Sequence, residues 1–311
     1  MHGKGTFKAI LCGALVASTL GLSLAQAAER LAVPSGIDFR RLKMIEKGEK
    51  RLKVYVEMIG ISDRGEDVKL LINKRAGDSV GTADQMRDKF SNAISKTERF
   101  IVLTDKIKDI RDDDDAILVQ GRIVTAMQDV EDWTAAKKAI TTVKLSLNVI
   151  NPTTSQKEFA RTIMGIYGTE PGEGTIVKAE RDLKSSYIQE SLKNDFERAL
   201  TEALTNVAAT VERRYRPMAK VIDVDGSDLA LTGGSEQGLN PNDKLVVFRG
   251  KMLKVNGKDE PGIMKAVALV ECPSVGTESS TCRIVQKGEN GDPKPGDYAV
   301  VADDSMRLKL Q

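Results

Sequence analysis

One long amphipathic stretch, from about Leu183 to Arg214, constrains the fold more than any other feature of the sequence. Its apolar residues recur at the three- and four-residue spacing that lines one face of an α-helix. At a rise of about 1.5 Å per residue the helix would be roughly 45 Å long, enough to lie across a whole sheet. We therefore expect a sheet beneath it. The apolar stripe consists of Leu183, Tyr187, Ile188, Leu192, Phe196, Leu200, Leu204, Val207 and Val211.

The preceding residues contain patterns that predict such a sheet. Apolar and polar residues alternate over 52–58, which indicates a strand with one buried face. A helix is expected from about Thr82, because Thr82 and Gln85 have the spacing of a capping box. Further strands are expected at 99–103 and 116–124.

The strongest hairpin signal follows these strands. Residues 143–149 alternate between apolar and polar side chains, Asn151–Thr154 supply a turn, and 159–167 return. Glu170–Gly174 then form a loop before the long helix. The order β, α, β, β, β, β, α predicts an α+β domain in which helices cover a sheet.

The character of the sequence changes at Arg216-Pro217, which we take as a domain boundary. Turn signals then come every 8–12 residues or so, with short apolar runs between them, which is typical of a small all-β barrel. The predicted organisation is a signal peptide at 1–27, a lead-in segment at 28–50, an α+β domain at 51–216 and an all-β module at 217–311. The expected strands of this module are 220–224, 229–231, 245–248, 267–270 and 298–301.

The beginning of the chain resembles a cleaved secretory signal. Lys4 and Lys8 precede an apolar run over 9–24, and Ala25-Gln26-Ala27 has the small-residue spacing of a cleavage site. Cys12 lies too early in the apolar run to be a lipidation site. We therefore expect an exported, periplasmic protein that is not a lipoprotein.

The one histidine of the chain, His2, lies in this leader, so the mature part from about Ala28 has no imidazole. That excludes Ser-His-Asp triads and HExxH zinc sites, and it argues against an enzyme. An Asp/Glu pair acting on a glycan stays open as an alternative. Loss of the leader removes two of the 47 basic residues, which leaves a formally neutral chain with 45 acids. A neutral chain does not favour nucleic-acid binding.

Two cysteines, Cys272 and Cys282, remain in the mature chain. They flank a turn-like stretch, Pro273–Thr281, between two apolar runs. In an oxidising periplasm this arrangement predicts a disulfide that clamps a hairpin, the alternative being two free thiols. A metal site is not expected, because no histidine or further cysteine can complete it.

Three other segments carry weak chemical signals. Asp112–Asp115 are acidic but lack the alternating spacing of a calcium loop, so a solvated turn is expected. Gly234–Gly238 does not have the serine position of a nucleophile elbow. Gly172-Glu173-Gly174 is not followed by the Lys-Ser pair of a phosphate-binding loop. We therefore predict no catalytic, cofactor-binding or metal-binding residues and no small-molecule substrate.

Several of these segments together resemble the CsgG family of curli assembly and secretion proteins, which have a TolB-N-like fold. The similarity is carried by QMRDKFSNAISKTERFIVLTDK, DDDDAILVQGRIV and TTVKLSLNVINPTTSQKEFARTIMG, followed by the long helix, and it covers roughly 50–215. The tail, with KVIDVDGSDLALTGGSEQGLNPNDKLVVFRG and KPGDYAVV, is similar to the SH3-like module of the flagellar assembly protein FlgT. This resemblance implies a periplasmic or outer-membrane-associated assembly protein without catalytic residues.

The resemblance is incomplete. Curli secretion channels are lipidated and insert long hairpins into the outer membrane, whereas the corresponding segments here, Thr125–Lys138 and Ile166–Ser186, are charged or interrupted by proline and glycine. The expected partners are envelope proteins of a secretion system, an appendage or a basal body, or other copies of this chain in a ring. A secretion pore subunit and a flagellar basal-body ring component are the alternative functions.

Overall fold

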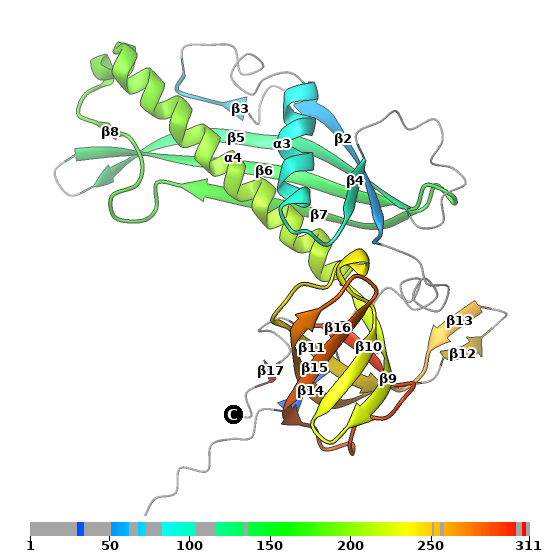
Figure 1. The fold of residues 1–311 in the computed structure, drawn as a ribbon. Coiled ribbons are helices and arrows are strands. Elements are labelled where there is room, and N and C mark those ends of the chain that lie inside the picture. The colour runs from blue at the N-terminus through cyan, green and yellow to red at the C-terminus, as the bar shows by residue number, and fades with distance from the viewer. Residues whose placement is uncertain are drawn as a thin grey trace, which may run out of the picture.

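The computed structural model shows a helix-covered sheet joined to a small barrel by the end of a long helix (Figure 1). The predicted α+β class with a small β-barrel is confirmed. The predicted signal peptide, Asp112–Asp115 and most of the lead-in segment lie outside the residues that the structure describes. These are residues 30–33, 51–61, 68–72, 83–103, 116–133, 136–250, 252–255, 258–302 and 307–308.

The sheet has the strand order β4-β2-β5-β6-β7, with β3 paired to β5 and β8 paired to β6. Strand β2 runs parallel to β4 and β5, whereas β5, β6 and β7 form an antiparallel meander. The expected strands and the hairpin through Asn151–Thr154 are thus present. The bounds are β2 Lys53–Ile61, β3 Val68–Lys69, β4 Ile101–Leu103, β5 Ala116–Trp133, β6 Ala136–Ile150, β7 Lys157–Tyr167 and β8 Ile176–Val177.

Helix α3 (Ala83–Ser95) and helix α4 (Ser186–Arg214) both lie on one face of this sheet (Figure 1). Helix α4 ends where the sequence predicted, but it begins three residues later than the expected Leu183. The chain first makes a short 3-10 turn, η2 (Glu180–Lys184), and then passes through Ser185 in an extended conformation.

The core forms where the apolar face of the sheet meets the two helices. Val54, Ile117 and Val143 are fully buried on the sheet, and Phe90 and Phe196 pack over them from α3 and α4. Full burial along α4 begins at Leu192, and the earlier stripe residues Leu183 and Ile188 are partly buried against the core. Tyr187, also a member of the predicted stripe, is 76% exposed.

Strands β5 and β6 form a longer hairpin than the sequence patterns indicate. The strand expected to end at Val124 continues to Trp133, and its partner starts again at Ala136. Opposite charges face each other across this extension, since Glu131 pairs with Lys138 and Asp132 with Lys137 in the register. Charged side chains therefore continue the hairpin, although they break the alternation from which a strand is predicted.

The second domain is a closed barrel with the strand order β10-β15-β14-β11-β16-β9, beginning four residues after α4 ends. Two smaller pairs lie beside it. Strand β1 (Arg30–Leu31) pairs with β17 (Arg307–Leu308), and β12 (Met252–Val255) pairs with β13 (Lys258–Pro261). The barrel strands are β9 Met218–Asp225, β10 Asp228–Thr232, β11 Asp243–Arg249, β14 Lys265–Val275, β15 Ser279–Lys287 and β16 Tyr298–Val301.

The lead-in segment contributes to this domain. Leu31 and Val33 pack against a barrel cluster that includes Met218 and Phe248. The beginning and the end of the described chain therefore meet on the barrel. No helix among the described residues has the length and apolar character needed to cross a membrane.

Candidate functional site

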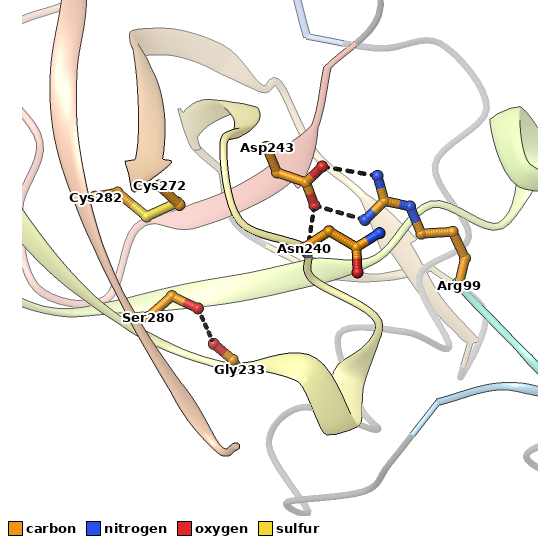
Figure 2. The surroundings of a disulfide bond; sticks show 7 residues. All are labelled: Arg99, Gly233, Asn240, Asp243, Cys272, Ser280 and Cys282. Atoms are coloured by element: carbon orange, nitrogen blue, oxygen red, sulfur yellow. Dashed lines mark hydrogen bonds and ion pairs between the residues drawn. A yellow bond between two sulfur atoms is a disulfide. The ribbon is translucent and has the colours of Figure 1, made fainter. Parts of the chain in front are cut away.

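A buried arginine joins the two domains. Arg99 comes from the segment between α3 and β4, and its guanidinium makes a two-pronged contact with the carboxylate of Asp243 in the barrel, at 2.5 and 2.7 Å (Figure 2). It also donates to the carbonyl oxygen of Gly238 at 2.8 Å and to Glu212 of α4 at 3.2 Å. The side chains of Arg99 and Asp243 are only 10% and 11% exposed. Such paired hydrogen bonds set both distance and orientation.

The electrostatics of this joint keep Arg99 charged. Burial alone lowers the pKa of the guanidinium, but the hydrogen bonds and charge of Asp243 and the charge of Glu212 outweigh burial, so the pKa is raised. The backbone N–H of Asn240 also donates to Asp243, at 2.8 Å. The Asp243 carboxylate is therefore held from both domains.

A second arginine strengthens the same joint. The Nε of Arg51 donates to the carbonyl oxygen of Ser235 at 2.9 Å, and its backbone N–H donates to that of Glu236 at 2.8 Å. Both acceptors belong to the Gly234–Gly238 turn, whose serine position does not fit a nucleophile elbow. Gly238 has φ +87°, and a Cβ there would lie 2.9 Å from the carbonyl oxygen of Arg99. The backbone carbonyl groups of this turn thus accept hydrogen bonds from the arginines of the sheet domain.

Cys272 and Cys282 form a disulfide between the neighbouring strands β14 and β15 (Figure 2). Both side chains are buried in the barrel core. They lie at an irregularity in the pairing, between the Glu271–Arg283 and Ser274–Thr281 pairs. The disulfide therefore links strands β14 and β15 at a place where their regular pairing is interrupted.

Reduction of this disulfide should lower the stability of the barrel. In the chain-entropy model a loop of about this length contributes roughly 2–3 kcal/mol to the free energy of unfolding. The measurement is urea unfolding with and without reductant. A variant with both Cys272→Ala and Cys282→Ala should show no response to reductant. Two alkylatable thiols in the unreduced, exported protein would contradict the prediction.

Among the described residues, no helix covers the other face of the sheet. Along β5 the side chains of Leu118, Gln120 and Arg122 alternate with buried core residues and are half-buried. Gln120 donates to Glu57 of β2 at 2.5 Å. The Nε of Arg122, on the central strand, is buried and has no hydrogen-bond partner within the described part of the chain. We call this surface the helix-free face.

A cleft lies between α4 and the loop over 168–176; we call it the α4 cleft. It has a volume of about 460 Å³. An open hollow of about 700 Å³ adjoins it along α4, away from the loop. Tyr167, Asn194 and Arg198 line both cavities. The Arg198 guanidinium lies 5.0 Å from the ring centroid of Tyr167 and also donates to its hydroxyl. Further lining residues include Gly172, Gly174, Thr175, Ile176, Tyr187 and Ser191.

The loop side of the α4 cleft is held by hydrogen bonds. Buried Asp195 accepts from the backbone N–H of Thr175 at 2.8 Å and from its hydroxyl at 2.6 Å. Glu173 accepts from the N–H groups of Gly168 and Glu170 at 3.3 and 3.4 Å. Lys138, buried in the β5–β6 hairpin, donates to the carbonyl oxygen of Glu170 at 2.7 Å. These hydrogen bonds hold the loop over 168–176 against α4 and the β5–β6 hairpin.

The structure brings together residues that no local pattern of the sequence connects. Arg99 and Asp243 lie 144 positions apart, so no local pattern marks them as a pair. Gly172 and Gly174, in the segment that lacks the Lys-Ser pair of a phosphate-binding loop, line the α4 cleft. No group of three or more metal-ligand side chains occurs among the described residues. The absence of catalytic residues, cofactors and metals remains a prediction.

Comparison with known proteins gives likenesses in structure only. No family model matches the chain, and no curated protein matches it in sequence. A putative neuraminyllactose-binding hemagglutinin homolog from Helicobacter pylori is 15% identical with a TM-score of 0.34, and the match covers 52% of this chain and 83% of that one.

Two further bacterial structures are similar over about half of this chain. A minor lipoprotein from Acinetobacter baumannii is 10% identical with a TM-score of 0.27, over 51% of this chain and 94% of its own. The PelC dodecamer from Paraburkholderia phytofirmans is 9% identical with a TM-score of 0.24, over 50% of this chain and 88% of its own.

Proposed function

We propose that this chain is exported and acts in the periplasm or at the outer membrane as a non-enzymatic assembly protein of the CsgG type. It would help to build or stabilise a cell-surface structure or a secretion system by contacting other envelope proteins. The sequence resemblance over roughly 50–215 and the signal-like beginning of the chain support this reading.

The disulfide supports the compartment. A bond between Cys272 and Cys282 forms and persists in oxidising surroundings, such as the periplasm, and is rare in the cytosol. Because both sulfurs lie in the barrel core, the second domain depends on that environment for part of its stability.

The helix-free face is the observation that carries the assembly role. It combines half-buried apolar side chains, such as Leu118, with polar ones, and the buried Nε of Arg122 needs an acceptor that the described chain does not provide. A protein partner that covers this face would bury its apolar side chains and supply hydrogen-bond partners to its polar ones. The joint at Arg99 would hold the barrel in a fixed orientation beside that partner.

In-cell crosslinking of the tagged protein in its native envelope tests this function. The captured species are weighed and identified by mass spectrometry. A ladder of multiples of the chain supports a ring, and one envelope protein captured repeatedly supports an adaptor. Recovery of the monomer alone, or of a cytoplasmic chain with both cysteines reduced, would contradict the proposal.

An Arg122→Glu variant locates the contact. The matched control is Arg161→Glu, which makes the same charge change at an exposed position of edge strand β7. Crosslinks lost in the first variant and retained in the second place the partner on the helix-free face. Equal crosslinking in both variants would place the partner elsewhere.

A further inference from the structure

Strand β7 is the last strand of the described sheet, so one side of its backbone has no neighbouring strand there. Helix α4 shows which backbone groups point outward at this edge. Its Asn206 side chain donates to the carbonyl oxygen of Met164 at 3.0 Å, and its Glu202 carboxylate accepts from the backbone N–H of Ile166 at 3.0 Å. Because the backbone of a strand repeats every two residues, Ala160 and Thr162 also direct their N–H and C=O groups away from β6.

These outward groups form an open ladder. Within the described part of the chain, no hydrogen bond reaches the outward N–H and C=O groups of Ala160 and Thr162. Both residues are exposed, and so is Arg161 between them. Backbone donors and acceptors at the spacing of a strand are complementary to the backbone of another extended chain. The chemistry of the edge therefore specifies its occupant as a strand.

The open ladder is short. Toward the end of β7, side chains of α4 already occupy backbone groups of Met164 and Ile166. Toward the start of β7, the pairing with β6 shifts its register at Glu158. Such an irregularity bends a strand and disrupts its ladder. The regular open stretch is therefore 160–162, with α4 at one end and the irregularity at the other.

This stretch is poorly suited to pairing with β7 of a second copy. A two-fold axis at Arg161 would place two arginines directly opposite each other, which is destabilising. An axis at Thr162 would require the carbonyl oxygen of Met164, which Asn206 already occupies. An axis at Ala160 would require Glu158, where the strand is irregular. The edge thus favours an extended segment of a different protein, which needs only the open groups.

We infer that an extended segment of a partner protein adds to the sheet as a strand beside 160–162. Its backbone exchanges hydrogen bonds with Ala160 and Thr162, and its residue opposite Arg161 is not basic. Thr162 lies in one cross-strand row with Ser146 and Arg122, so the added strand widens the helix-free face. The inference rests on the proposed function and specifies how a partner is held at the margin of that face.

Amide hydrogen exchange, measured residue by residue by NMR on the purified, oxidised protein, tests whether the ladder is open. The amides of Ala160 and Thr162 should exchange fast, whereas β6 should protect those of Arg161 and Ile163. Slow exchange at Ala160 and Thr162 in the monomer would show that the edge is closed. Protection that rises with protein concentration would place a second copy on the edge. Either result would overturn the inference.

Peptides test the occupant. The protein is applied to an array of peptides of about 15 residues, tiled across the exported proteins of the same cell. The tightest peptide should slow amide exchange at Ala160 and Thr162. It is then made again with N-methyl groups on alternate residues, which removes their N–H donors. Methylation of the set that faces β7 should weaken binding by about tenfold or more, and methylation of the other set by less than about twofold.

A proline variant places the peptide on β7. Thr162→Pro removes an outward N–H and leaves the hydrogen bonds to β6, because proline is tolerated where the N–H of an edge strand faces solvent. It should weaken binding of the labelled peptide, measured by fluorescence anisotropy, by about tenfold or more. The matched control, Thr162→Val, keeps the N–H and should change the affinity less than about twofold. Circular dichroism melting confirms that both variants are folded.

Two results with peptides would also overturn the inference. These are an array with no bound peptide, or equal affinities of the two N-methylated peptides, a comparison that uses the unaltered protein. In-cell crosslinking separates this failure from that of the proposed function. Whole-protein crosslinks that persist in a Thr162→Pro strain, with no peptide binding in vitro, reject strand addition and leave the assembly role standing.

Discussion

Replacing Arg99 with methionine should lower the free energy of unfolding by about 3–5 kcal/mol, the usual result of removing one partner from a buried ion pair. The carboxylate of Asp243 would remain buried with its charge unpaired across the domain joint. Because these contacts connect the two domains, the variant should also unfold in two steps, barrel and sheet domain separately. Calorimetry and urea unfolding followed by circular dichroism measure both effects.

An exposed ion pair provides the matched control. Arg283 pairs with Asp228 on the barrel surface, with side chains 67% and 49% exposed. Arg283→Met should change the free energy of unfolding by less than about 1 kcal/mol. Adding Asp243→Asn to Arg99→Met should restore part of the lost stability, since it removes the unpaired charge. A single transition and a loss below about 1 kcal/mol in Arg99→Met would show that the joint does not hold the domains together.

The contribution of Arg99 to the free energy of unfolding should be the same at neutral and at mildly alkaline pH. Its pKa is raised in the folded state, so the stabilisation is fully present below the ordinary pKa of arginine and is lost only as pH rises through the still higher folded value. The effect of Arg99→Met should therefore be the same at about pH 7 and about pH 9. Unfolding at both pH values checks this directly.

Replacing Gly165 with valine should destabilise the sheet domain by about 2–4 kcal/mol, at or above the upper end of ordinary overpacking. At Gly165 the backbone of strand β7 lies in direct contact with the backbone of α4. A Cβ here would meet the carbonyl oxygen of Ala199 at 2.1 Å and the backbone nitrogen of Ala203 at 2.4 Å. These atoms belong to the helix backbone, so α4 itself has to move. Urea unfolding measures the loss.

Ala160→Val is the control for this prediction. Ala160 lies on the same strand but is exposed, so its Cβ has space, and valine suits a strand. The free energy of unfolding should change by less than about 0.5 kcal/mol in Ala160→Val. If Gly165→Val were as stable as this control, the tight contact between β7 and α4 would not exist in solution.

The local patterns of the sequence predicted most of the elements. The alternation over 143–149, the turn at Asn151–Thr154 and the end of α4 at Arg214 were all predicted from neighbouring residues. These signals are reliable because each one depends on the period of a helix or a strand and on turn residues a few positions away. The small barrel was predicted in the same way, from the regular spacing of its turns.

Predictions failed where a residue's surroundings decided its role. Tyr187 fits the apolar stripe of α4, but the stripe alone does not show which of its side chains the core covers. The extension of β5 beyond Val124 depends on the partner strand β6, which stays paired with it as far as Trp133. Neither fact is contained in the hydrophobic pattern of one segment.

By itself, the sequence determined the α+β class, the order of the main elements of the first domain and the small barrel. These follow from local periodicity, turn chemistry and composition. Only the tertiary structure decided that Arg99 meets Asp243, and that Tyr167, Tyr187 and Arg198 surround one cleft. Such contacts join residues far apart in the chain, and their energy comes from burial and charge pairing that exist only once the domains have packed.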